Sequence, residues 1–380
     1  MEFDPTEEQR MIRDMVRRFA ENKIAPIADE LDRTERFPAE TLRSMAELGL
    51  MSMLVPAETG GTGLGAVAYS LALMEIGRFC MSHATITSVT NMVCEGIHRF
   101  GTSAQQARHI PKIASGEYLA AAFALTEPGA GSDAGSLKAT AARTEDGYEL
   151  NGTKVFITSG ANAGLYMVAA KTDRELGKQG ITVFLVEAGT PGLAVGRKEE
   201  KLGQRASDTV ELVFDGCRVP RDSLLGREGD GFKVMLSSLD GGRIGIASNS
   251  CGLARAALES ARDHAKERQQ FGRPISEFQA IQFKLADMAT RIDAGTLLTL
   301  RAAHRKEAGL PFSQEASMAK VYATEAAQWV AREALQIHGG YGYIREYPVE
   351  RYLRDAMAVT LYEGTSEIQR LVIARNLLGG

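Results

Sequence analysis

Glu363 is an acidic residue in the stretch LYEGTSEIQR, residues 361–370, between an apolar run and the expected start of a helix. Ser366 and Gln369 have the S-x-x-Q spacing of a capping box, which places Glu363 on the bend before that helix. The apolar residues of the expected helix recur every three or four positions and should pack onto the protein: Ile368, Leu371, Val372, Ala374 and Leu378. A carboxylate between two buried segments either caps or pairs with the helix, or serves as an acid or base.

The second stretch that could do chemistry is FALTEPGAGSDAGS, residues 123–136, where three glycines fall within seven residues. Such a segment is either a plain turn or a backbone whose N–H groups approach a ligand. Alternating, strand-like sequence follows it, whereas the dinucleotide motif G-x-G-x-x-G requires a helix at that point. A Rossmann-type site is therefore excluded.

The composition describes a globular protein of two or three domains, with 380 residues, 44% apolar and 24% charged. The net charge is −4 without a basic block, which argues against nucleic acid or an anionic membrane as partner. No apolar run approaches the ~18 residues of a membrane span, and the acidic start MEFDPTEEQR predicts neither a signal nor a transit peptide. We expect a cytoplasmic protein.

Neither the cysteines nor the histidines have the spacing of a metal site. The cysteines lie far apart and form no C-x-x-C pair: Cys80, Cys94, Cys217 and Cys251. Six scattered histidines form neither an i, i+4 pair nor a Ser-His-Asp motif, so no metal centre and no hydrolase triad is expected.

Hydrophobic periodicity divides the chain into three parts and predicts a mainly helical α+β protein. Residues 1–120 are expected to be helical, with Thr6 and Gln9 as a capping box and a later helix that turns Leu42, Met45 and Leu48 inward. A glycine-rich loop over 56–65 precedes another helix over 67–78, and helix continues to about residue 115.

Residues 121–228 show short β-type runs at roughly ten-residue spacing, separated by turn signals that include Asp146-Gly147 and Asn151-Gly152. Without helices between the strands, this part predicts an antiparallel sheet or small barrel. Residues 229–380 return to long helical patterns, over 231–267, around Ile281 to Ile292, and up to Gly339-Gly340, which predicts a four-helix bundle.

Four motifs occur in a characteristic order: TEPGAGSD at 126–133, FGRPI with QAIQFKLADM within 271–288, QIHGGYGY at 336–343, and YEGTSEIQR at 362–370. Together they make the chain similar to the acyl-CoA dehydrogenases over nearly its whole length. The family's architecture, a helical domain, a β domain and a four-helix bundle, agrees with the periodicity.

The resemblance implies an FAD enzyme that oxidises the Cα–Cβ bond of an acyl-CoA thioester to a trans-2-enoyl-CoA. Glu363 would be the base that takes the α-proton while the β-hydrogen leaves as hydride to flavin N5. Its backbone N–H and a ribityl hydroxyl of FAD would polarise the thioester oxygen. Burial should raise the pKa of Glu363 and outweigh the opposite effect of the helix N-terminus.

The resemblance also implies the binding residues. Cofactor contacts are expected from Phe123, Leu125, Thr126, Gly131, Ser132, Phe156, Ile157, Thr158, Thr365 and Glu367. Contacts to the FAD of a neighbouring subunit and to its adenine side are expected from Arg268, Phe271, Gln279, Gln336, Gly339 and Gly340. Substrate contacts are expected from Ser132, Asp240, Arg243 and Gly364. Phe156 stands where the family commonly has Trp, which reduces the stacking area.

Without the family, several of these residues have ordinary explanations. Arg268 and Gln279 would be solvated helix residues, Asp240 and Arg243 an exposed ion pair, and His338 a helix C-terminal residue. The tyrosines 341, 343, 347 and 352 would be packing residues.

Gly242 occupies the helix position from which some relatives supply the base, so Glu363 is the remaining candidate. The sequence around it resembles both butyryl-CoA and isobutyryl-CoA dehydrogenases and favours a short straight or branched acyl group as the substrate. The resemblance also implies the partners, an electron-transferring flavoprotein and further copies of this chain, as a tetramer built as a dimer of dimers. The alternatives are an acyl-CoA oxidase, a dehydrogenase of a carrier-bound acyl group, or a non-catalytic scaffold of the same fold.

Overall fold

The computed structural model describes residues 4–379, and its first part is helical. The helices are α1 (Glu7–Phe19), α2 (Ala28–Thr34), α3 (Ala39–Glu47), α4 (Gly65–Phe79), α5 (Met81–Phe100) and α6 (Ser103–Ala114). The Thr6–Gln9 capping box forms as expected, with both reciprocal hydrogen bonds present. Leu42 and Met45 of α3 are buried, whereas Leu48 is 37% exposed, because the helix ends before it.

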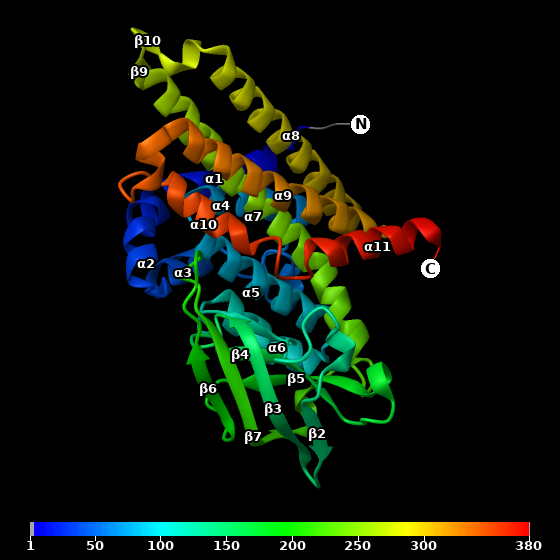
Figure 1. Cartoon of the computed structure of the whole chain (residues 1–380). Helices are drawn as coiled ribbons and strands as arrows, with labels where there is room; N and C mark the ends of the chain where they lie inside the picture. Colours follow the sequence, from blue (N-terminus) through cyan, green and yellow to red (C-terminus); the bar gives the residue numbers. More distant parts are fainter. Residues whose placement is uncertain (1–3, 380) are drawn as a thin grey trace.

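A β domain follows, lying below the helices in Figure 1. Its strands are β1 (Ala121–Ala124), β2 (Thr140–Arg143), β3 (Gly147–Thr158), β4 (Leu165–Lys171), β5 (Ile181–Glu187), β6 (Leu193–Lys198), β7 (Thr209–Pro220) and β8 (Leu224–Leu225). They form one sheet in the order β6-β7-β3-β2-β4-β5-β8, with β1 beside β4. The sheet differs from the expected antiparallel sheet, because β1 and β2 both pair with β4 in parallel.

The turn predicted at Asn151-Gly152 is wrong, because β3 runs through it. The β3–β7 register shifts between Leu150 and Gly152, and the Asn151 Oδ1 accepts a hydrogen bond from the Gly216 N–H. The Asn-Gly signal here marks an irregularity in a long strand, where the side-chain amide replaces a ladder partner.

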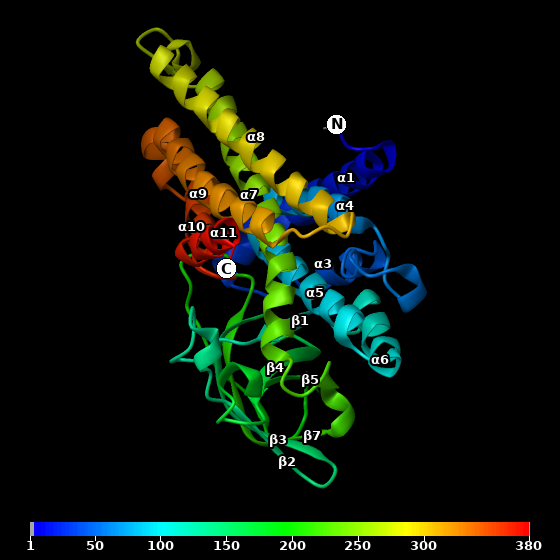
Figure 2. The same cartoon turned by 90° about the vertical axis from the view of Figure 1, so that its right-hand side faces the viewer.

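The remaining chain forms a bundle of long helices. The helices are α7 (Gly231–Glu267), α8 (Gln279–Glu307), α9 (Ser313–His338), α10 (Val349–Ala358) and α11 (Ser366–Leu378), with the short hairpin of β9 (Gln269–Gln270) and β10 (Arg273–Pro274) between α7 and α8. Figure 2 shows α7 and α8 side by side along much of their length, with the β domain at the far end of α7.

Helix α7 is the central element, because it packs on both the N-terminal helices and the rest of the bundle. Its contact with α4 needs glycine on both helices: a Cβ on Gly252 would lie 2.1 Å from the Met74 carbonyl oxygen. A Cβ on Gly77 would lie 2.7 Å from that of Asn249. The two backbones therefore cross in direct contact.

Helix α11 departs from the expected amphipathic packing. Its buried residues are Ser366 and Gln369, while Leu371, Leu377 and Leu378 are 51%, 67% and 85% exposed. In Figure 1 this helix extends sideways from the bundle toward the C-terminus. These three leucines thus remain uncovered within one chain, whereas Ile368 and Val372 are half-buried.

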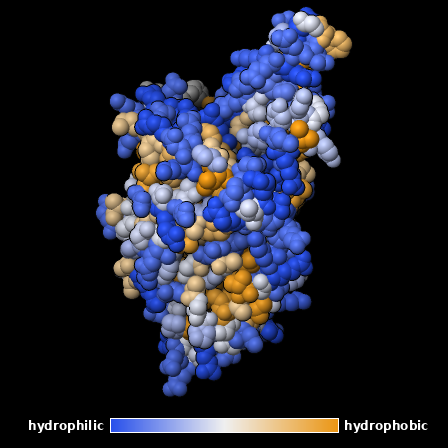
Figure 3. All heavy atoms as spheres, turned by 90° about the vertical axis from the view of Figure 1, so that its left-hand side faces the viewer, coloured by the Kyte–Doolittle hydropathy of each residue, from blue (hydrophilic) through white to orange (hydrophobic). Residues whose placement is uncertain are grey.

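The surface carries further apolar area. Figure 3 shows apolar atoms gathered over the lower part of the molecule, where the β domain lies, and in smaller areas among the helices. No helix within residues 4–379 combines the length and the apolar character needed to cross a membrane.

Candidate active site

A cavity opens where α5, α7, the β domain and the loop between α10 and α11 meet, with about 180 Å³ of space for water-sized molecules. Glu363 lines it together with residues from all three parts of the chain. The predicted residues in its wall are Phe123, Leu125, Thr126, Gly131, Ser132, Phe156, Thr158, Arg243, Glu363 and Gly364. The structure thus brings together residues that lie as far apart in sequence as 123 and 364.

Glu363 has an uncommon backbone conformation and a buried carboxylate without a hydrogen-bond partner among the described residues. Its backbone lies in the left-handed region with φ +52°, and Gly364 follows with φ +87°. Both carboxylate oxygens are shielded from water, and neither has a hydrogen-bond partner among residues 4–379. Burial raises the pKa of Glu363 to about 7, against the opposing attraction of Lys320 and Arg243.

The Glu363–Gly364 backbone is fixed from two sides. The Gln369 side-chain amide donates to the Glu363 carbonyl at 3.1 Å and to the Gly364 carbonyl at 2.8 Å. From α9, the Lys320 ammonium donates to the same Gly364 oxygen at 2.7 Å. Strained backbone conformations persist where surrounding contacts determine them, as these contacts do here.

The cap of α11 differs from the expectation. Thr365, not Ser366, is the N-cap, and its Oγ1 accepts from the Ile368 N–H at 3.4 Å. Gln369 does not complete a capping box, because its side chain turns back to the Glu363–Gly364 carbonyls instead. Neither Thr365 nor Glu367 lines the cavity, and Glu367 is exposed.

The β-domain wall of the cavity is set by a buried ion pair. Lys154, 0% exposed, contacts Glu127 at 2.7 Å and donates to the Leu125 carbonyl at 3.0 Å. Glu127 also accepts from the N–H groups of Lys138 and Ala139. One lysine therefore anchors the start of the glycine-rich loop to β3.

After Lys154 the strand β3 bulges, and the next two predicted residues, Phe156 and Ile157, lie in different surroundings. Phe156 has φ +57° and is 64% exposed in the cavity wall, whereas Ile157 is 1% exposed and belongs to the β-domain core. Ile157 therefore does not contact the cavity. A wall with an open aromatic ring, the hydroxyls of Ser132 and Thr158 and free space beside Gly131 fits a flat cofactor with polar edges.

Arg243 reaches the cavity from α7. It is 4% exposed, its Nη1 donates to Asp240 at 2.5 Å and to Ser317 Oγ at 3.3 Å, and its Nε has no partner among the described residues. The pair of Asp240 and Arg243 is therefore not the exposed ion pair expected without the family, since the guanidinium is buried. Asp240 stands behind it and does not line the cavity.

The other predicted cofactor residues lie elsewhere. Arg268, Gly339 and Gly340 line a separate cavity of about 510 Å³ near the α7–α8 hairpin. Phe271 is 91% exposed, and Gln279 and Gln336 are exposed as well. Within one chain, these residues lie apart from the cavity around Glu363. His338 ends α9, as expected, with Nδ1 within 2.8 Å of the Ala334 carbonyl.

Several residues of the cavity wall were not predicted as site residues: Thr85, Val89, Met92, Ala134, Leu236, Leu239, Tyr362 and Ile368. The α5 residues among them lie in a helix whose small polar side chains are buried nearly all round. A helix whose side chains are buried on nearly all faces must be enclosed by other elements. This pattern was the signal in the sequence that could have indicated that α5 lies beside the site. Nothing in the pattern of α9 singled out Lys320.

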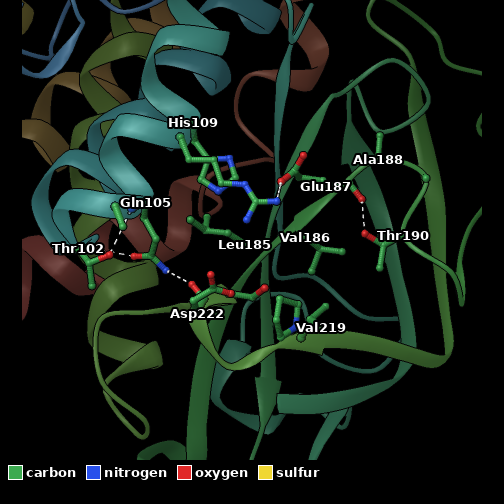
Figure 4. A pocket seen from close by; sticks show the side chains of 15 residues that line it. Thr102, Gln105, His109, Leu185, Val186, Glu187, Ala188, Thr190, Val219 and Asp222 are labelled. Atoms are coloured by element: carbon green, nitrogen blue, oxygen red, sulfur yellow. Dashed lines mark hydrogen bonds and ion pairs between the residues drawn. The ribbon is translucent and has the colours of Figure 1, made fainter. Parts of the chain in front are cut away.

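A third cavity, of about 340 Å³, lies between α6 and the β domain and contains none of the predicted site residues (Figure 4). Arg108 and Glu187 approach to 2.5 Å across it, and the Gln105 amide donates to the backbone carbonyls of Asp222 and Leu224. These bonds join the helical and β domains, so we interpret this cavity as part of their contact.

The sequence matches the models of the acyl-CoA dehydrogenase N-terminal domain over 6–117, middle domain over 122–217 and C-terminal domain over 229–378. The chain belongs to the acyl-CoA dehydrogenase family. An acyl-CoA dehydrogenase of Bacillus subtilis is 50% identical over 99% of both chains. Members of this family use FAD, and the cavity wall described above fits that cofactor.

Two solved structures match this acyl-CoA dehydrogenase over all of both chains. Butyryl-CoA dehydrogenase from Megasphaera elsdenii superimposes with a TM-score of 0.97 and is 42% identical. A chain in a structure of the electron transferring flavoprotein of Acidaminococcus fermentans superimposes with a TM-score of 0.98 and is 44% identical.

Proposed function

We propose that this acyl-CoA dehydrogenase removes hydrogen from Cα and Cβ of a short straight or branched acyl-CoA thioester, with Glu363 as the base. The observation that carries the proposal is the Glu363 carboxylate itself. Its oxygens are buried and unpartnered in the cavity wall, and its pKa is raised to about 7. A base titrating near the operating pH combines the ionised state with a strong affinity for a proton.

The surrounding residues suit the proton transfer. The Glu363 backbone N–H forms no hydrogen bond with any of residues 4–379, so it is free to polarise a thioester oxygen. Arg243 adds positive charge beside the same cavity. Bound FAD supplies the acceptor for the β-hydrogen and its electron pair, which no side chain can provide.

The short acyl chain is supported by the likeness to butyryl-CoA dehydrogenase. The test is anaerobic bleaching of the bound flavin by a panel of acyl-CoA thioesters, from butyryl and isobutyryl to palmitoyl. We expect the fastest bleaching with a four-carbon chain; a maximum at long chains would overturn this choice.

We further propose that the cofactor lies between subunits of a tetramer. The group of Arg268, Phe271 and Gln279 is exposed and remote from Glu363 within one chain, so a second chain is needed to bring them together. Uncovered apolar residues on α8 and α11 would form the contacts: Phe283, Leu297, Leu371, Leu377 and Leu378. Sedimentation of the holoenzyme tests the assembly, and a monomer that retains FAD would contradict it.

We propose an electron-transferring flavoprotein as the acceptor, in view of the similar chain from a structure of such a protein. The reduced enzyme should be stable in air and be reoxidised on adding an electron-transferring flavoprotein. Rapid oxygen consumption with peroxide release would instead indicate an oxidase.

A further inference from the structure

Lys320 on α9 is a buried cation that the reaction described so far does not use. Its side chain is 0% exposed, and its Nζ makes one hydrogen bond within the described residues, to the Gly364 carbonyl at 2.7 Å. No carboxylate among those residues lies within the 4.0 Å of an ion pair. A charge in such surroundings is costly unless it has a specific role.

The position of Lys320 relates it to the loop that carries Glu363. Lys320, Thr324 and Gln328 follow one another at i, i+4 and i+8, so they share one face of α9. Gln328 donates to Thr360 Oγ1 at 2.9 Å, and Lys320 holds Gly364 at the other end of the same loop. Helix α9 therefore supports the loop on both sides of Glu363.

Lys320 lies behind the loop and does not line the cavity, in contrast to Arg243. It acts on Glu363 in two ways, through the Gly364 carbonyl and through its charge. Burial lowers the pKa of Lys320 to about 8, while the attraction of Glu363 opposes the decrease. The ammonium is consequently charged over the range in which Glu363, with a pKa of about 7, loses its proton.

Other charged or titratable groups act on this pair. They are Arg243 and Asp240 from α7, Tyr69 from α4, Tyr362 from the loop, Glu325 from α9 and Glu367 from α11. Arg243 already shares its charge with Asp240 at 2.5 Å, whereas Lys320 has no such partner among the described residues. Lys320 is therefore the cation whose charge is least compensated beside Glu363.

We propose that Lys320 is a positioning residue for the base. Its ammonium fixes the Gly364 carbonyl, and with it the Glu363 side chain and backbone N–H, and its charge favours the ionised form of the carboxylate. The proposal rests on the assigned role of Glu363. It explains how a carboxylate with buried, unpartnered oxygens can be anionic when substrate arrives.

The test compares holoenzyme variants Lys320→Met, which removes bond and charge, and Lys320→Gln, which keeps a donor without charge. The pH dependence of kcat/KM reports the base in the free enzyme. We expect its apparent pKa to rise by about one unit in both variants. The plateau rate should fall roughly 10- to 100-fold in Lys320→Met and less in Lys320→Gln, which can still hold Gly364.

The matched control is Thr324→Val, one turn along α9, where a buried hydroxyl bonds only within its own helix. It should keep the wild-type profile. If Lys320→Met does not fold, the shift in Lys320→Gln alone decides. A wild-type pH profile in the folded Lys320 variants, with Glu363→Gln inactive, overturns this proposal alone, whereas an active Glu363→Gln overturns the assigned base.

Discussion

The carboxylate of Glu363 rests against the bare backbone of Gly242. A Cβ built on Gly242 would lie 2.3 Å from Glu363 Oε2 and 2.8 Å from Met92 Sδ. Both neighbours are side-chain ends, so they can move, but the carboxylate would then leave its position. The glycine on α7 and the acid in the loop thus depend on each other sterically.

Gly242→Ala should therefore fold but lose activity. Displacing the proposed base by about 1 Å is expected to lower kcat roughly 100-fold, while a helical alanine partly offsets the crowding in stability. Gly252→Ala on the same helix is the contrasting variant. Its Cβ would meet the Met74 backbone at 2.1 Å, so it should lower the melting temperature. Full activity of Gly242→Ala would show that the carboxylate does not need this position.

The raised pKa of Glu363 predicts a pH-dependent cost in stability. Between pH 4.5 and about 7 the folded protein keeps a proton that the unfolded chain has released, so stability decreases as pH rises through this window. Glu363→Gln removes the cost and should be more stable than the wild type above pH 7, by roughly 1–3 kcal/mol, with little difference near pH 4.5.

Urea denaturation of the holoenzyme at both ends of that window measures the difference. Glu30→Gln is the control, because Arg36 lowers the pKa of that carboxylate. Its replacement should therefore not increase the stability at high pH. Equal stability of wild type and Glu363→Gln at high pH would contradict a buried, unpaired carboxylate.

Much of the architecture could be predicted from periodicity and capping, and much of the site detail could not. The helix over 231–267 and the Thr6 cap follow from local sequence, because both depend on neighbouring residues. The irregular β3 at Asn151 depends on a bond from Gly216, which is remote in sequence. Lys320 has an ordinary helical spacing, and its role follows only from the loop that packs over it.

Lys154→Met should destabilise the β domain and loosen the glycine-rich loop. Removing one partner of a buried pair leaves Glu127 uncompensated, which typically costs about 3–5 kcal/mol. The midpoint of chemical denaturation and the FAD content report the two effects. The double variant with Glu127→Gln should recover part of the stability, and additive losses in the two single variants would argue against a coupled pair.

The proposed cofactor site between subunits predicts complementation between two inactive chains. In a mixed dimer of Glu363→Gln and Arg268→Ala, one site receives both changes and the other receives neither. Co-expression should thus restore roughly a quarter of the wild-type activity at random assembly. Mixing Glu363→Gln with Ser132→Ala, two residues of the same cavity wall, is the control and should restore much less. No recovery in the first mixture would place the Arg268 group outside the site.

The central claim is that Glu363 removes the α-proton, and anaerobic addition of butyryl-CoA to wild type and Glu363→Gln tests it most directly. The variant keeps the shape of the site, so it should bind FAD and perturb its spectrum on binding the thioester. We expect the flavin of the wild type to bleach within the turnover time and that of Glu363→Gln to remain oxidised. Bleaching of the variant at the wild-type rate would contradict the claim.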